Sequence, residues 1–250
     1  TGLCGREGAS PSLGAGLCVY VYSLMQSMDQ RDTWDRFYAQ REERSGHFDW
    51  FFGYETVSGI LLPTLQGLPP GPARLLDVGC GTSALGLELY RNCPRPLHVS
   101  CVDFSPVAVE RLRRLLQAAP PPRHPLSRLG CHVADATNLG GAFEGGSFHL
   151  VFDKGTCDSL LRCPRGPGRA GEMVAECLRM LRPGGTLFQF SDEDPDARVP
   201  FLERASGCCQ AGGGSVTVRE AGQIGGICYY VYMLGRRVPE AAGQGGGTEN

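Results

Sequence analysis

Four aspartates stand at or just after the ends of short apolar segments that read as buried strands: Asp77, Asp103, Asp135 and Asp153. In a parallel α/β sheet the carboxyl ends of the strands lie along one edge, and ligands bind there at the point where the strand order reverses. One acid at such an edge would be unremarkable, but four in register are hard to explain as packing. We therefore predict a ligand site lined by these carboxylates.

A glycine-rich turn follows the first of these aspartates. Residues 77–84 contain a Gly-x-Gly-x-x-Ala pattern that begins at Gly79 and includes Gly81. Glycines in such a turn let the backbone approach a cofactor, and an acid at the end of the next strand, here Asp103, accepts hydrogen bonds from ribose hydroxyls. By itself the pattern fits an NAD-dependent oxidoreductase. However, we find neither a catalytic set of His, Lys and Tyr nor a substrate domain.

S-adenosylmethionine accounts for more of these residues. This cofactor has no pyrophosphate, so the glycine turn would meet its methionine and ribose portion, and Asp103 would accept both ribose hydroxyls. Asp135 and Ala136 would accept from the adenine amino group and donate to a ring nitrogen, and Asp77 would orient the turn or meet the methionine amino group. Because the sulfonium is cationic, carboxylates and aromatic faces around it are favourable.

Alternating strands and helices must position these residues. The expected strands are residues 74–78, 98–102, 131–134, 148–152 and 186–190, followed by a hairpin of 215–219 and 227–234. Helices are expected over 84–90, 106–117 and 169–181, with Ser105 as the N-cap of the second and Pro106 at its first position. This pattern predicts a Rossmann-like α/β fold: a seven-stranded, mostly parallel sheet with a C-terminal antiparallel hairpin and helices on both faces.

Aromatic residues are concentrated before the first strand. Trp34 and Tyr38 are four residues apart and would share one face of a helix, and residues 48–54 form the densest aromatic run of the chain, before a further helix that ends near Gln66. On pattern alone, these aromatics favour a helix packed at the edge of the domain.

Composition excludes several classes of protein. The 250 residues suit one domain, and the formal net charge of −2 argues against nucleic acid as a partner. No apolar window is long enough to span a membrane. The 12 cysteines are scattered without a CxxC pair and are expected to be reduced thiols, and the five histidines lack metal-ligand spacing, so no metal is expected. Lys154 is the one lysine among the 24 basic residues.

The ends of the chain differ in composition from the middle. Residues 1–27 are expected to be a leader or a disordered segment, and residues 237–250 a disordered, glycine-rich tail. Residues 28–236 are expected to form one catalytic domain.

Several motifs resemble the seven-β-strand, class I S-adenosylmethionine-dependent methyltransferases. They are Asp-x-Gly-x-Gly-x-Ser at 77–83, Asp-Ala at 135–136, Asp-Lys-Gly-Thr at 153–156 and Leu-Arg-Pro-Gly-Gly at 181–185. The third motif and the early Trp/Tyr segment resemble the branch that contains elongation-factor 1A lysine methyltransferases. Longer runs closely resemble the mitochondrial citrate synthase lysine methyltransferases: 34–36, 48–54, 102–109 and 190–196. The resemblance spans residues 28–234.

The resemblance implies an enzyme that uses S-adenosylmethionine to methylate a lysine of citrate synthase in the mitochondrial matrix. It places the following residues at the cofactor: Trp34, Tyr38, Trp50, Gly79, Asp103, Phe104, Asp135, Ala136 and Lys154. It also makes residues 28–70 an N-terminal helical lid over the cofactor. The alternatives are another protein substrate such as an elongation factor, or an inactive cofactor-binding module. Because residues 1–27 do not read as a transit peptide, a cytoplasmic location is the alternative to the matrix.

The substrate side of the site is less defined. Asp153 is a candidate catalytic residue that would receive the substrate lysine, or alternatively a cap for the turn after its strand. Asp192, Glu193 and Asp194 would recognise a cationic lysine, or form a solvated loop. Many lysine methyltransferases of this fold carry Asn/Asp-Pro-Pro-Phe/Tyr where this chain has residues 153–156, so their lysine contacts do not carry over.

Overall fold

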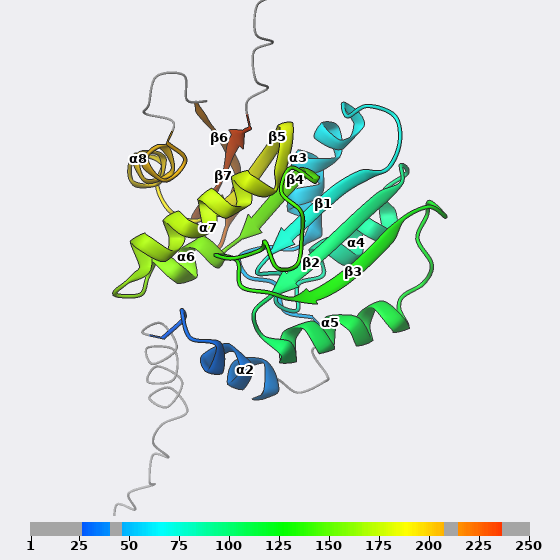
Figure 1. Cartoon of the computed structure of the whole chain (residues 1–250), viewed down its shortest axis with the longest axis horizontal. Coiled ribbons are helices and arrows are strands. Elements are labelled where there is room, and N and C mark those ends of the chain that lie inside the picture. The colour runs from blue at the N-terminus through cyan, green and yellow to red at the C-terminus, as the bar shows by residue number, and fades with distance from the viewer. Residues whose placement is uncertain (1–26, 41–46, 208–214, 237–250) are drawn as a thin grey trace, which may run out of the picture.

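We describe residues 27–40, 47–207 and 215–236 of the protein from a computed structural model. The predicted leader, except Ser27, and the predicted tail lie outside the described residues. The described strands all belong to one sheet (Figure 1).

The sheet has seven strands in the order β3-β2-β1-β4-β5-β7-β6. The strands are β1 (Ala73–Val78), β2 (Leu97–Asp103), β3 (Arg128–Val133), β4 (Phe148–Lys154), β5 (Leu181–Ser191), β6 (Val216–Ile224) and β7 (Ile227–Gly235). The first five strands pair in parallel, whereas β7 pairs antiparallel with both β5 and β6. The predicted fold class is therefore confirmed, and the strand order reverses between β1 and β4.

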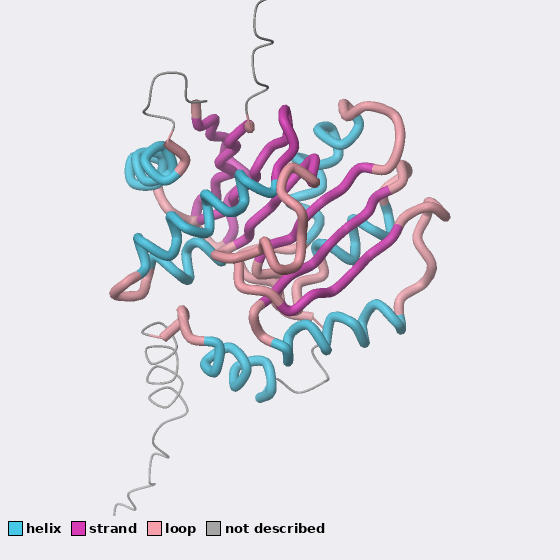
Figure 2. The backbone as a smooth tube through the Cα atoms, in the orientation of Figure 1, coloured by secondary structure: helices cyan, strands magenta, loops and turns pink. Residues whose placement is uncertain are grey.

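Helices cover both faces of the sheet (Figure 2). They are α2 (Arg31–Gln40), α3 (Tyr54–Gln66), α4 (Leu85–Asn92), α5 (Pro106–Ala118), α6 (Thr156–Leu161), α7 (Gly166–Met180) and α8 (Pro195–Ala205). Leu61, Leu85 and Val109 bring α3, α4 and α5 into a hydrophobic cluster on one face. Met173 and Leu202 bring α7 and α8 into the cluster on the other face.

Local sequence signals explain several helix ends. Ser105 caps α5 as predicted, because its hydroxyl accepts a hydrogen bond from the backbone N–H of Ala108. Asp194 caps α8 in the same way by accepting from the N–H of Asp196. We did not predict α8, although the pair of Asp194 and Pro195 is a recognisable helix start.

The expected element boundaries need small corrections. The third strand covers Arg128–Val133, not residues 131–134, and the fifth covers Leu181–Ser191, longer than expected. The short helix α6 was also not predicted. It begins after Gly155, which adopts a left-handed φ of 90° and turns the chain sharply after β4.

A third hydrophobic cluster holds α2 at the carboxyl edge of the sheet. Trp34, Phe37 and Tyr38 of α2 pack there with Ala108 of α5 and Cys163. All eight cysteines in the described ranges are free thiols and seven of them are buried, as expected for reduced packing residues. Among the helices described, none has the length and apolarity that crossing a membrane would require.

Candidate active site

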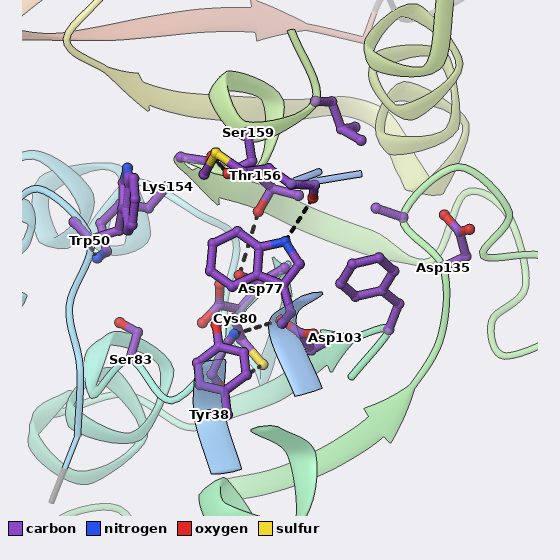
Figure 3. Close-up of a pocket in the computed structure, with 18 of the residues that line it drawn as sticks. Tyr38, Trp50, Asp77, Cys80, Ser83, Asp103, Asp135, Lys154, Thr156 and Ser159 are labelled. Atoms are coloured by element: carbon purple, nitrogen blue, oxygen red, sulfur yellow. Dashed lines mark hydrogen bonds between the residues drawn. The ribbon is translucent and has the colours of Figure 1, made fainter. Parts of the chain in front are cut away.

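A cavity lies at the carboxyl edge of the sheet, beside β1 and β4 (Figure 3). Its walls come from α2, the aromatic segment that we define as residues 47–54, the turn after β1, the ends of β2 and β3, and the chain from β4 into α6. Its lining includes all but one of the residues predicted at the cofactor and the catalytic centre: Trp34, Tyr38, Trp50, Asp77, Gly79, Gly81, Asp103, Phe104, Asp135, Ala136 and Lys154.

The glycine turn passes so close to its neighbours that side chains would not fit. Gly79 and Gly81 have φ of 64° and 52°, in the left-handed region. A Cβ atom on Gly79 would collide with the side chain of Thr156, and one on Gly81 would collide with the hydroxyl of Tyr38. The turn therefore packs tightly against both α2 and the start of α6.

Asp103 fixes the shape of the turn from the end of β2. Its Oδ2 accepts a hydrogen bond from the N–H of Gly81 and its Oδ1 accepts from the N–H of Ser105, both at 2.8 Å. Burial raises its pKa to about 6, although these two N–H groups act to lower it. Each oxygen has a further lone pair, so the ionised carboxylate can also accept from a ligand in the cavity.

Asp77 provides the clearest sign of a cationic ligand. Its side chain is buried in the cavity wall, and its Oδ2 has no hydrogen-bond partner among the described residues. Burial raises its pKa to about 8. A buried carboxylate is costly without a compensating charge, and an ammonium or sulfonium group in the cavity would reduce that cost. The residues present therefore fit the predicted S-adenosylmethionine.

Asp135 lines the cavity just after β3. Its Oδ1 accepts hydrogen bonds from the N–H and the hydroxyl of Thr137, and its Oδ2 accepts from the guanidinium of Arg169 at 3.0 Å. Arg169 comes from α7, lines the cavity and was not predicted. A single arginine in a helix carries no sequence signal for such a contact.

The early aromatics face the cavity as well as packing at the edge of the domain. The indole N–H of Trp34 donates to the carbonyl of Met28 at 2.7 Å, which fixes the ring. Trp34 stacks on Tyr38 with ring centroids 5.8 Å apart and meets Trp50 edge to face at 6.1 Å. These three aromatic rings line one cavity, so packing at the edge of the domain is not their whole role.

Lys154 crosses from β4 to the aromatic segment. Its ammonium donates to the carbonyl of Trp50 at 2.6 Å and to Oδ1 of Asp49 at 3.2 Å. Burial lowers the pKa of Lys154, and the neighbouring Asp49 carboxylate opposes that shift. Asp49 was not predicted as a site residue. A single carboxylate within an aromatic run gives no signal of its contacts.

Asp153, the predicted catalytic residue, does not line the cavity. It is fully buried, and its carboxylate accepts hydrogen bonds from the N–H groups of Thr156 and Cys157 and from the amide of Gln189. Successive side chains of a strand point to opposite faces, and Asp153 lies beside Val78 on the face that α6 covers. The geometry therefore supports the capping role of Asp153 and gives no support to its catalytic role.

The predicted recognition segment also lies outside the cavity lining. Asp192 forms an ion pair with Arg162 at 3.8 Å, Asp194 caps α8, and the backbone of Glu193 accepts from the hydroxyl of Tyr232. Arg162 directly follows α6, whose residues Ser159 and Leu160 line the cavity. The segment thus lies beside the helix that forms one cavity wall.

Comparison with known proteins identifies the class of enzyme. Residues 75–185 match the family model described as a methyltransferase domain. The citrate synthase-lysine N-methyltransferase, mitochondrial, of Homo sapiens is 48% identical over 90% of this chain and 94% of that protein. The chain belongs to this family. The relative of the same name from Danio rerio is 39% identical over 87% of each chain.

More distant similarities are consistent with a methyltransferase. EEF1A lysine methyltransferase 4 of Mus musculus is 30% identical over 68% of this chain and 64% of that protein. Among solved structures, magnesium protoporphyrin IX methyltransferase from Synechocystis PCC 6803 with bound SAM is 17% identical, with a TM-score of 0.53 over 91% of this chain and all of that one. A methyltransferase from Methanosarcina mazei is 16% identical, with a TM-score of 0.55 over 70% of this chain and 98% of that one. These two structures show the shared fold.

Proposed function

We propose that this lysine methyltransferase transfers a methyl group from S-adenosylmethionine to a lysine of citrate synthase in mitochondria. The observation that carries the proposal is the 48% identity over nearly the whole length of the human enzyme of that name. The buried carboxyl group of Asp77 in the cavity lining supports it from the structure, because a negative charge there would favour a cationic cofactor.

Four residues of the cavity would hold the cofactor. Asp103 would accept hydrogen bonds from the ribose hydroxyls, Asp77 would face a positive group, and Asp135 with Ala136 would meet the adenine. When bound, S-adenosylmethionine supplies an electrophilic methyl group on a cationic sulfur. The aromatic faces of α2 and of the aromatic segment would exclude water from that charge, which strengthens its attraction to the carboxylates.

Positioning is the main task left to the chain. The amine of a lysine attacks only when it is neutral, and its ordinary pKa of about 10.4 means that it must lose a proton on entering the site. A site that holds the acceptor amine in line with the methyl group and excludes water accelerates the reaction chiefly through orientation. Asp153 would contribute indirectly, by fixing the start of α6 behind the cavity wall.

We infer a guiding role for the acidic segment, Asp192, Glu193 and Asp194. Glu193 and Asp194 are exposed beside α6, where their charge can attract a cationic lysine over several ångströms. Such attraction acts while the two proteins approach each other, so it would speed the association of the protein substrate and not the chemical step. Salt would screen it.

Transfer of labelled S-adenosylmethionine tests the proposal and its alternatives together. The full-length protein is incubated with citrate synthase, with elongation factor 1A and with an unrelated lysine-rich protein as control. We expect label on citrate synthase alone. Label on elongation factor 1A alone would favour the substrate of the more distant relatives. Cofactor binding without any transfer would indicate an inactive binding module, and calorimetric binding of NAD alone would support an oxidoreductase.

A further inference from the structure

Asp49 joins three parts of the cavity wall that are far apart in the sequence. Its Oδ1 accepts a hydrogen bond from the hydroxyl of Ser83, in the turn after β1, and another from the ammonium of Lys154, at the end of β4. Asp49 itself belongs to the aromatic segment. One carboxylate oxygen thus links the aromatic segment to the two strands beside which the cavity lies (Figure 3 shows Ser83, Lys154 and Trp50).

The charges in this link are shielded from water. The side chain of Lys154 is 5% exposed and that of Asp49 is 16% exposed. His47 lies 3.7 Å from the other Asp49 oxygen, but its side chain is 55% exposed. Removal of one partner from a buried ion pair leaves the other charge uncompensated, which is strongly unfavourable. Loss of either partner of the link between Asp49 and Lys154 should therefore cost more than loss of one partner of a pair at the surface.

The same lysine fixes the backbone next to a strained residue. Lys154 donates to the carbonyl of Trp50, and the next residue, Phe51, has a φ of 68°. A bulky residue other than glycine rarely adopts this left-handed conformation, and it persists only where the surroundings impose it. The N–H of Phe52 also donates to the Trp50 carbonyl, and the Phe51 ring packs against Tyr229 at 5.3 Å. The conformation of this turn thus depends on contacts with the sheet.

These contacts place the Trp50 ring in the cavity wall. A Cβ atom on Gly155, the residue after Lys154, would collide with the Trp50 ring. Trp50 and Gly155 both line the cavity. Lys154 therefore holds the backbone of Trp50 while the neighbouring glycine makes room for its ring.

We propose that Asp49 is a positioning residue for cofactor binding, which holds the aromatic segment against the cavity through Ser83 and Lys154. Lys154 contributes to the site through this link, and its presence in a chain otherwise rich in arginine has a physical reason. The identity of the ligand rests on the proposed function, whereas the link itself does not.

Two single variants and their combination test this role in the full-length protein. Asp49→Asn removes the negative charge, Lys154→Met removes the positive one, and the double variant removes both. We expect each single variant to raise the calorimetric Kd for S-adenosylmethionine roughly tenfold or more, as for the loss of a hydrogen bond to a charged group. The Kd of the double variant should be no higher than that of the single variant with the higher Kd, because each change breaks the same link.

Tryptophan fluorescence reports the link without any ligand. Both tryptophans of the chain, Trp34 and Trp50, line the cavity. In Asp49→Asn we expect emission at longer wavelength and stronger quenching by acrylamide than in the wild type. Glu88→Gln is the matched control, because it removes a carboxylate from the half-exposed pair with Arg91 on α4, away from the cavity lining. This control should leave both the Kd and the emission unchanged.

The outcomes separate this inference from the proposed function. Wild-type affinity and emission in Asp49→Asn, or strictly additive effects in the double variant, would overturn the role of Asp49. A merely structural role would lower the melting temperature and the active fraction, but would leave the Kd of the folded protein unchanged.

If the wild type does not bind S-adenosylmethionine, the proposed function fails, and the emission of Asp49→Asn still decides whether the link exists. Should that variant not fold, Ser83→Ala gives a milder test that we expect to change both readouts in the same direction.

Discussion

Two adjacent residues at the end of β4 take different roles because a strand alternates its side chains. Lys154 points to the aromatic segment and the cavity, whereas Asp153 is buried against α6 on the other face. The sequence placed both at the carboxyl edge of the sheet but did not indicate which of them faces the ligand. Period-two alternation assigns a face only when the register of the strand is known.

Replacement of Asp153 separates capping from catalysis. We expect Asp153→Asn to lower the free energy of unfolding by about 1 kcal/mol, as for a weakened helix cap, and to reduce kcat of the folded protein less than tenfold. Chemical denaturation and steady-state kinetics measure the two effects. A loss of kcat greater than about a hundredfold at unchanged stability, as expected for a lost acid or base, would restore a catalytic role.

Asp103 gives a prediction for cofactor affinity. Asp103→Ala removes the acceptor for the ribose hydroxyls and for the N–H groups of Gly81 and Ser105, so the Kd for S-adenosylmethionine should rise at least tenfold. In the wild type the affinity should also weaken as the pH falls below about 6, where the carboxylate becomes protonated. Calorimetry across this pH range tests both expectations. Unchanged affinity in a folded variant would remove Asp103 from the site.

At the scale of elements, the sequence predicted the strands better than the cavity walls. Apolar runs that end in Asp77 and Asp103 indicated β1 and β2 and the edge where the ligand site lies. The helices α6 and α8 were missed, because one is a short turn after Gly155 and the other carries Pro200 inside a segment rich in acids. Contacts made by single side chains from distant elements, such as Arg169, have no local pattern and needed the structure.

The packing of α2 against the glycine turn can be tested with a pair of glycine substitutions. Gly81→Ala places a methyl group against Tyr38 at a φ of 52°, so it should lower stability and weaken cofactor binding at least tenfold. Gly59→Ala in α3 meets no atom within 4 Å, and should raise the free energy of unfolding by about 0.5–1 kcal/mol. Denaturant titration and calorimetry on both variants measure these effects. If both variants show the same change in stability and in Kd, this would contradict the close approach of Tyr38 to Gly81.

At the scale of the whole molecule, the buried acids make stability depend on pH. Burial raises the pKa of Asp77 to about 8 and that of Asp153 to about 7. Both values exceed those of an unfolded chain, so the folded state binds more protons than the unfolded state in this range, and stability falls as the pH rises. His132 and His149 have a lowered pKa and act in the opposite direction below about pH 6.5.

We therefore expect the melting temperature of the protein without cofactor to fall between about pH 6.5 and about pH 8, the range that the two acids dominate. Asp77→Asn removes one of the two titrating groups and should flatten this slope, which scanning calorimetry of both proteins measures. A melting temperature that rises with pH in this range, or an identical slope in the variant, would contradict the burial of an ionisable Asp77.

Methylation of a lysine of citrate synthase by this chain can be tested directly. The most direct measurement is intact-mass and peptide mass spectrometry of purified citrate synthase after incubation with the full-length protein and S-adenosylmethionine, with the Asp103→Ala variant in parallel. We predict that the wild type adds the mass of one or more methyl groups at a lysine and that the variant adds much less at limiting cofactor. Citrate synthase of unchanged mass, under conditions where calorimetry shows the cofactor bound to the wild type, would contradict the account.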